Sequence, residues 1–155
     1  MNAAMQKQKS TKSTVPGARG KTSEGDAYAV LVGDVLQSTR FPDQKALFNG
    51  LRQQFEWVNE RVAAVQPLRF TVGDEFQAAY SDVVSAFRAV LLLRLKFRAM
   101  KSAIDQAPAP MSKQQVRIGL SYGEISVFQE DREPYGQSGE AWWNARKAIE
   151  HAEGP

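Results

Sequence analysis

The chain has 155 residues, of which 43% are hydrophobic and 24% charged, a composition that suits one globular domain with one core. The absence of cysteine excludes disulfides, thiolate metal sites and cysteine catalysis, and the single histidine, His151, argues against a Ser-His-Asp triad. Apolar runs such as residues 89–93 are far shorter than the roughly 20 residues of a bilayer span, and we expect no secretory leader. These features predict a cytoplasmic protein that works through carboxylates, hydroxyls and cations.

The net charge of +3 lies in the first 26 residues, which hold five basic and two acidic side chains, whereas residues 27–155 hold 15 of each. Residues 1–26 are also poor in large apolar side chains, so we expect a disordered basic tail. We favour a solvated leader as its interpretation, and an arm that binds nucleic acid is the alternative. The balanced charge of the remaining residues gives no argument for nucleic-acid binding.

The first predicted element is a central strand at residues 28–32, because this wholly apolar run suits burial on both faces of a sheet. It ends at Gly33 and Asp34. Asp43 then caps an expected helix of about 20 residues, which Pro67 follows. Apolar side chains recur in this helix at helical spacing, at Leu47, Phe48, Leu51, Phe55, Val58 and Val62.

A hairpin and a second helix follow. Strand-like runs at residues 68–72 and 76–80 flank a turn that contains Gly73. The second helix is expected at residues 83–100 after an Asp82 cap. Because it is apolar around much of its girth, we expect it to be well buried, with Phe87 in the core. Its basic side chains are interpreted as a solvated face; they are Arg88, Arg94, Lys96, Arg98 and Lys101.

Two further strands, at residues 116–122 and 125–128, and a helix at residues 140–153 complete the prediction. The order β-α-β-β-α-β-β-α predicts an α+β fold over residues 27–155. We expect a ferredoxin-like (palm) βαββαβ sheet with helices on one face and an extra C-terminal hairpin strand and helix. Whether a further C-terminal segment follows is left open.

The most informative residues are acidic. In this topology the end of the first strand and the tip of the hairpin come together, and they carry Asp34 and Asp74, with Glu75 next to Asp74. Converging carboxylates repel one another unless a cation lies between them, and Mg²⁺ takes one or two carboxylates together with water and phosphates. The arrangement therefore predicts a metal–nucleotide site. The alternative is that Asp34 only ends a strand and Asp74 only suits a turn.

Several segments resemble the motifs of class III nucleotide cyclases. Asp34-Val35-Leu36-Gln37-Ser38-Thr39 resembles their D-I-x-G-S-T segment, and Thr71-Val72-Gly73-Asp74 resembles their second metal motif. Residues 117–124 resemble their R-I-G-L-H-x-G-E strand, and Asp74-Glu75-Phe76 is similar to the GGDEF signature of diguanylate cyclases, which share the palm core. More closely, residues 28–150 resemble the bacterial SatD family, through Gly33-Asp34 and residues 73–77 and 139–149.

The cyclase resemblance implies that Asp34, Asp74 and the backbone carbonyl of Val35 ligate two divalent ions, Mg²⁺ or Mn²⁺, and the GGDEF resemblance adds Glu75. The segment Leu36, Gln37, Ser38 and Thr39 would face the triphosphate of a nucleoside triphosphate. The ribose 3′-hydroxyl would attack the α-phosphate and expel pyrophosphate, which gives a cyclic nucleotide. Asn144 and Arg146 would act with the two aspartates in catalysis, and Lys147 would neutralise phosphates.

The sequence also departs from the cyclase pattern. Phe70 stands where adenine-selective cyclases carry lysine, Gln37 replaces a glycine of D-I-x-G-S-T, and Val72 replaces the first glycine of GGDEF. In the late cyclase motif an arginine follows the asparagine by four residues, whereas here Arg146 follows Asn144 by two. These departures leave open a catalytically degenerate palm that senses a nucleotide or binds a partner protein.

Three further expectations concern assembly and packing. Class III cyclases build their site from two subunits head to tail, so the resemblance implies a homodimer in which the final helix of one chain serves the site of the other. Trp143 is expected to pack against the sheet, with stacking on a base as the alternative. Either Arg69 or Arg117, on strands near the hairpin, could pair with a site carboxylate.

Overall fold

The computed structural model describes residues 26–36, 38–104, 116–126 and 137–152, so the expected basic tail lies outside the described residues. The elements are β1 (Ala27–Val35), a 3-10 helix (Ser38–Arg40), α1 (Gln44–Asn59), β2 (Gln66–Phe70), β3 (Glu75–Tyr80), α2 (Val83–Ile104), β4 (Val116–Glu124) and α3 (Glu140–His151). The long elements up to β4 keep the βαββαβ order of the predicted palm. None of the helices in these ranges is long and apolar enough to cross a bilayer.

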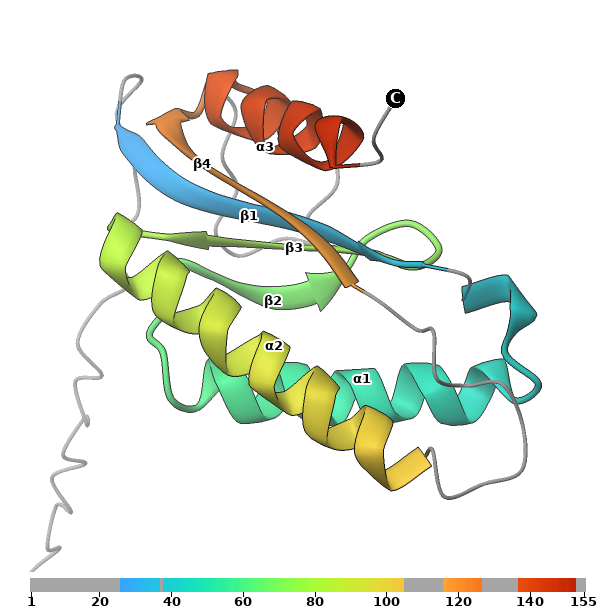
Figure 1. The fold of residues 1–155 in the computed structure, drawn as a ribbon. Coiled ribbons are helices and arrows are strands. Elements are labelled where there is room, and N and C mark those ends of the chain that lie inside the picture. Colours follow the sequence, from blue (N-terminus) through green and yellow to red (C-terminus); the bar gives the residue numbers. More distant parts are fainter. Residues whose placement is uncertain (1–25, 37, 105–115, 127–136, 153–155) are drawn as a thin grey trace, which may run out of the picture.

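The described strands form one antiparallel sheet in the order β2-β3-β1-β4 (Figure 1). β1 is central, as its apolar run predicts. In the register of the sheet, Asp34 of β1 lies opposite Glu75 of β3 on one side and opposite Arg117 of β4 on the other. Directly opposed residues of antiparallel strands project to the same face, so these three charged side chains form a row across one face of the sheet.

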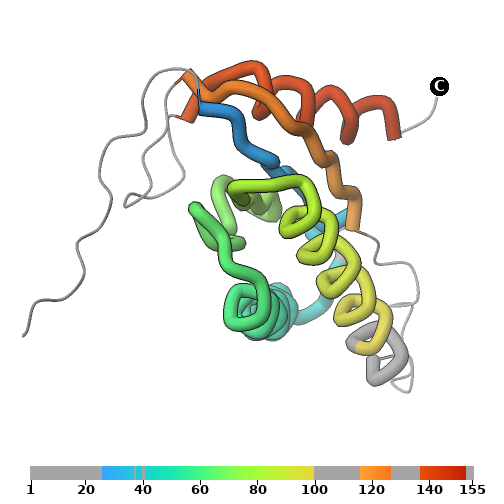
Figure 2. Tube along the Cα trace, turned by 90° about the vertical axis from the view of Figure 1, so that its left-hand side faces the viewer, coloured from blue at the N-terminus to red at the C-terminus, as the bar shows by residue number. Residues whose placement is uncertain are grey.

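Alternation along β1 divides its side chains between two cores. Leu31 and Val35 pack with α1 and α2, whereas Val30 and Val32 pack with α3. α1 and α2 lie together on one face of the sheet and α3 lies on the opposite face (Figures 1 and 2). The α+β palm fold is therefore confirmed, and the extra C-terminal helix covers the second face, which is the face of the charged row.

Aspartates cap the two long helices as predicted. Asp43 accepts a hydrogen bond from the backbone N–H of Ala46 at 2.9 Å, and Asp82 accepts one from the backbone N–H of Ser85 at 2.8 Å. The Ser85 amide, and after it the Ser85 hydroxyl, hold the pKa of Asp82 below its usual range, because they stabilise the ionised carboxylate. α1 ends at Asn59, a few residues earlier than expected, although Val62 beyond it is still buried.

Two predictions of burial are wrong. Phe87 of α2 is 53% exposed and Trp143 of α3 is 59% exposed. A helix that lies on a sheet buries only one stripe of its surface, and on α2 that stripe is occupied by Ala86, Ala89 and Leu93. On α3, the neighbouring Trp142 is buried against the sheet. Successive residues of a helix point about 100° apart, so Trp143 faces away from the sheet.

The strand expected at residues 125–128 is also corrected where the structure describes it. Ile125 and Ser126 are not in a strand, and the other two residues lie outside the described residues. The backbone N–H of Ser126 instead donates to the carbonyl of Ser138 at 2.9 Å, just before α3. This hydrogen bond ties the end of β4 to the start of α3.

α1 partly closes the outer edge of the sheet at β2. The Asn59 side chain accepts a hydrogen bond from the Leu68 N–H at 2.9 Å and donates one to the Leu68 carbonyl at 3.1 Å. A neighbouring strand would engage these two backbone groups in the same way. The residue before Leu68 is Pro67, which has no N–H to offer.

α3 approaches β4 closely at Gly119. A Cβ atom at Gly119 would lie 2.0 Å from the backbone oxygen of Ala145, which is a severe clash, because backbone atoms cannot move aside cheaply. A Cβ atom at Gly123, one turn of α3 away, would lie 3.6 Å from the backbone nitrogen of Ala141, an ordinary contact. Gly119 therefore sets the distance between α3 and the sheet.

Replacing Gly119 by alanine should lower the free energy of unfolding by about 1–3 kcal/mol, because α3 must shift away from β4 to relieve the clash. Urea denaturation measures this change. Gly123→Ala is the matched control, and we expect it to change the free energy of unfolding by less than about 1 kcal/mol. Equal losses in the two variants would contradict this docking of α3.

Candidate functional site

The charged row on the α3 face contains two arginine–carboxylate pairs. Arg117 donates from Nε to Oδ1 of Asp34 at 2.9 Å and from Nη2 to Oδ2 of the same carboxylate. The two side chains are 17% and 24% exposed, so the pair is largely shielded from water. Arg146 of α3 donates from Nη1 and Nη2 to the two carboxylate oxygens of Glu75, at 2.7 and 2.6 Å. Both pairs have the two-bond geometry that gives the strongest ionic hydrogen bonds.

The two pairs line one hollow of about 190 Å³, together with Val32, Ile149 and Glu150. Three carboxylates and two guanidinium groups give the lining a net charge of −1. The hollow therefore attracts a cation more than a free anion. Its lining comes from three neighbouring strands, β1, β3 and β4, and from α3.

Asp74 lies in the β2–β3 turn, next to Glu75. Gly73 in this turn has φ +63°, a conformation that glycine adopts without a steric penalty. The Ser38 hydroxyl donates to Oδ2 of Asp74 at 2.5 Å, and Ser38 is only 5% exposed. This contact spans 36 residues and holds the 3-10 helix that follows β1 against the turn.

The structure brings together part of the predicted site. Asp34, Glu75 and Arg146 line the hollow, and Asp74 with Ser38 lies one residue along the chain from Glu75. Val35 continues β1 opposite Val116, with its side chain in the core. Leu36 is partly buried and Thr39 is exposed, while Gln37 lies outside the described residues.

Three predicted site residues lie elsewhere. Phe70 packs against α1, with its ring 4.9 Å from that of Phe55, so its side chain and that of Asp34 are on opposite faces of the sheet. Asn144 and Lys147 are exposed on α3, and the Asn144 amide donates to Glu140 of the same helix at 3.5 Å. None of these three side chains lines the hollow.

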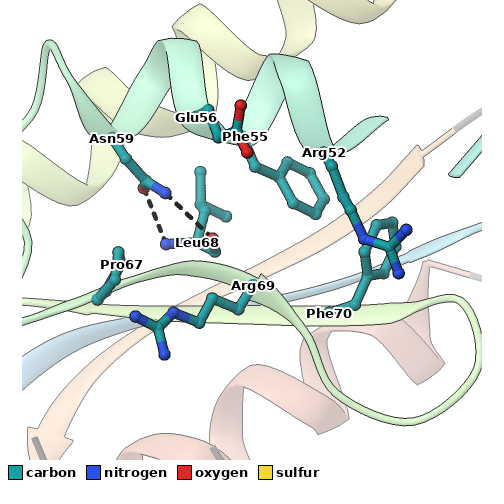
Figure 3. Close-up of a pocket in the computed structure, with 8 residues that line it drawn as sticks. All are labelled: Arg52, Phe55, Glu56, Asn59, Pro67, Leu68, Arg69 and Phe70. Atoms are coloured by element: carbon teal, nitrogen blue, oxygen red, sulfur yellow. Dashed lines mark hydrogen bonds between the residues drawn. The ribbon is translucent and has the colours of Figure 1, made fainter. Parts of the chain in front are cut away.

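Phe70 belongs to a second, larger pocket of about 510 Å³ between α1 and β2. Figure 3 shows Phe70 and Phe55 in this pocket, together with Arg69, the neighbour of Phe70 on β2. The Arg52 guanidinium lies over the Phe70 ring, 5.8 Å from its centroid. Asn59 occupies the other end of the pocket with the two hydrogen bonds to Leu68. The pocket is separate from the carboxylate site.

Register decides which arginine pairs with a site carboxylate. Arg117 on β4 lies opposite Asp34 of β1. Arg69 on β2 instead lies opposite Gln77 of β3, and its side chain is exposed. The sequence left the choice between them open, because it does not state which strand neighbours β1. The pairing of Arg146 with Glu75 was not predicted, although the sequence marked Arg146 on the last helix as a candidate site residue.

The donor chemistry of Asp34 and Asp74 fits a hard divalent cation, because both offer carboxylate oxygens near the end of β1. Within the described ranges, no three histidine, cysteine, aspartate or glutamate side chains gather as a metal site would require. Two carboxylates suffice for Mg²⁺, which completes its shell with water and phosphate oxygens. Glu75 is less suited to be a ligand, since Arg146 engages both of its oxygens.

The fold of this chain is similar to that of nucleotide cyclase domains in solved structures. It is similar to an adenylate/guanylate cyclase/hydrolase from Silicibacter pomeroyi, with TM-score 0.58, 22% identity, and coverage of 83% of this chain and 71% of that one. It is also similar to a bacterial light-regulated adenylyl cyclase (TM-score 0.62, 14% identity, 85% and 73% coverage). A guanylate cyclase domain from Catenaria anguillulae, solved in complex with GTP, shares the fold with TM-score 0.50, 17% identity, and 78% and 70% coverage.

The family itself follows from the sequence. The model of the SatD family matches residues 28–154, which is nearly all of the chain beyond the basic tail. The chain belongs to the SatD family. No curated protein matches it in sequence.

The shielded Asp34–Arg117 pair should be strongly coupled. In a double-mutant cycle of Asp34→Asn and Arg117→Gln, we expect a coupling free energy of about 1–3 kcal/mol, because each single variant removes an ionic hydrogen-bond partner from a charged, partly buried side chain. Denaturant unfolding of the four proteins measures it.

The Glu60–Arg61 pair provides the matched control, because its side chains are 72% and 42% exposed. Its coupling should be about 0–1 kcal/mol, since water screens exposed charges. Equal coupling in the two cycles would contradict the shielding of the Asp34–Arg117 pair.

Proposed function

We propose that this domain binds a nucleoside triphosphate together with Mg²⁺ or Mn²⁺ at the end of β1 and the β2–β3 turn. The observation that carries the proposal is the shielded Asp34–Arg117 pair, in which Asp34 lies opposite Glu75, the residue that follows Asp74. A metal-bound phosphate offers a cation to Asp34 and an anion to Arg117, so both shielded charges can change partner at once. A metal ion alone would draw Asp34 away from Arg117, and a phosphate alone would draw Arg117 away from Asp34, and each loss of this shielded contact costs free energy.

The cyclase fold supports the nucleotide as the source of that phosphate, because a guanylate cyclase domain of the same fold is solved with GTP. Asp34, Asp74 and the Val35 carbonyl are the groups that would hold the metal. When bound, the metal would neutralise phosphate charge and acidify the attacking hydroxyl. The amides of residues 36–39 and the Thr39 hydroxyl would donate to the triphosphate, while the Ser38 hydroxyl, which donates to Asp74, would hold this segment in place.

Turnover would join the ribose 3′-oxygen to the α-phosphorus and break the bond from that phosphorus to the oxygen that bridges to the β-phosphate, with pyrophosphate as the leaving group. The proton of the 3′-hydroxyl would pass to water. Arg117 and Arg146 lie where they can receive its charge. Asn144 and Lys147 lie on the outer side of α3, so they could reach only a nucleotide held by a second copy. A head-to-tail homodimer, and a cytoplasmic location, are part of the proposal.

A second candidate is a catalytically degenerate palm that senses a nucleotide or binds a partner. It is favoured by the pairing within the site, in which Arg117 engages both oxygens of Asp34 and Arg146 engages both oxygens of Glu75. An assay of pyrophosphate release with purified protein, Mn²⁺ and each nucleotide distinguishes the two functions. Product formation supports the cyclase, and binding without product supports the sensor.

The binding proposal predicts a metal-dependent gain in stability. Thermal unfolding with ATP, GTP, CTP or UTP should show a rise for at least one nucleotide with Mn²⁺ and no rise with EDTA. A ligand at 100 times its dissociation constant adds about 2.7 kcal/mol. Asp34→Asn and Asp74→Asn should each lose this rise, when compared with their own ligand-free unfolding temperatures.

Glu60→Gln is the control, because it removes an exposed carboxylate of the turn after α1 and should keep the full rise. An unchanged nucleotide affinity in both aspartate variants would overturn the assignment of the site. A rise that persists in EDTA would remove the metal from the proposal.

A further inference from the structure

α2 carries a line of exposed apolar side chains that the nucleotide site does not use. Val84, Phe87, Leu91 and Leu95 are 78%, 53%, 48% and 64% exposed. Their spacing of three, four and four residues follows the helical repeat, so they form one stripe along the outer side of α2. We call these four residues the α2 stripe. Exposed apolar side chains gathered in a line are typical of interaction surfaces.

The α2 stripe is flanked by positive charge. The helical repeat places Arg94 on one flank and Arg88 on the other, and both side chains are exposed. Residues 83–104 contain five basic and no acidic side chains. In Figures 1 and 2, no described helix or strand lies over the outer side of α2.

We propose that the α2 stripe docks an amphipathic helix of a partner protein whose apolar seam is flanked by Asp and Glu. An apolar seam with charged flanks is the pattern by which two helices pair, and complementary flanking charges select the partner. The four apolar side chains would be buried against the partner seam. Arg88 and Arg94 would meet its acidic flanks.

This occupant fits better than a second copy of the chain or a lipid surface. Pairing of α2 with the α2 of a second copy would bring arginines together on both flanks without an acidic residue to balance them. A helix that binds an anionic bilayer buries a broad apolar face in it, whereas the exposed apolar side chains of the α2 stripe form a single line along the helix.

The α2 stripe is independent of the nucleotide site. α1 and α2 cover one face of the sheet, whereas Asp34 and Arg117 lie on the face covered by α3. A substitution in the α2 stripe should therefore leave nucleotide binding unchanged. Because its residues are exposed, it should also leave the unfolding temperature unchanged.

Fluorescence anisotropy with the full chain tests the proposal. The probe is a fluorescein-labelled synthetic peptide of about 20 residues, long enough to be helical, with a leucine seam flanked by glutamates. A second peptide carries lysine in place of every glutamate. We expect the glutamate peptide to bind and the lysine peptide to bind at least roughly tenfold more weakly. Leu91→Gln and Arg94→Glu should each weaken binding of the glutamate peptide by roughly tenfold.

Trp143→Gln is the matched control, because it removes an exposed apolar side chain on the opposite side of the sheet and should leave the affinity unchanged. Equal binding of the two peptides, or no binding of either, would overturn the proposal. Two further outcomes would overturn it in favour of another occupant. They are binding to phosphatidylserine vesicles that Leu91→Gln abolishes, and a dimer in light scattering that the same substitution dissociates.

Discussion

β1 must be buried on both faces, and the remaining architecture follows from this constraint. Leu31 and its neighbours of the same face require the layer of α1 and α2, while Val30 and Val32 require α3 on the other side. The apolar run ends at Asp34, where the strand still lies between two partners. A carboxylate in that position needs a counter-charge, and Arg117 on the adjacent strand supplies it with two hydrogen bonds. The first charged residue of the site, Asp34, thus comes directly after the apolar run of β1.

The same face carries a second pair, and the two pairs differ in what they connect. The Asp34–Arg117 pair joins two strands of the sheet and is shielded, whereas the Glu75–Arg146 pair joins the sheet to α3 and is more exposed at its arginine. A ligand that displaced the first pair would rearrange groups within a rigid sheet. A ligand that displaced the second would release a contact between the sheet and a helix. The position of α3 and the state of the site are therefore physically linked.

The order of the elements from β1 to β4, the aspartate caps and the closeness of Asp34 to the β2–β3 turn could be predicted from the sequence, because they depend on periodicity and local turn chemistry. The strand expected at residues 125–128 is not formed at Ile125 and Ser126. The partner of Asp34 could not be predicted, since Arg69 and Arg117 are equally plausible until the strand order is known. The exposure of Phe87 and Trp143 was missed for another reason. Hydrophobicity alone does not say how much of a helix its neighbours cover, and α2 is apolar on both its covered and its outer side.

The hydrogen bonds of Asn59 to Leu68 bear on how the sheet meets other chains. A side-chain amide that engages both backbone groups of an edge residue occupies the place of an incoming strand, and the adjacent Pro67 removes a further donor. The backbone N–H and carbonyl of Leu68 are therefore not available to a strand of another chain, which disfavours edge-to-edge aggregation at β2. β4 lies at the other end of the described sheet order.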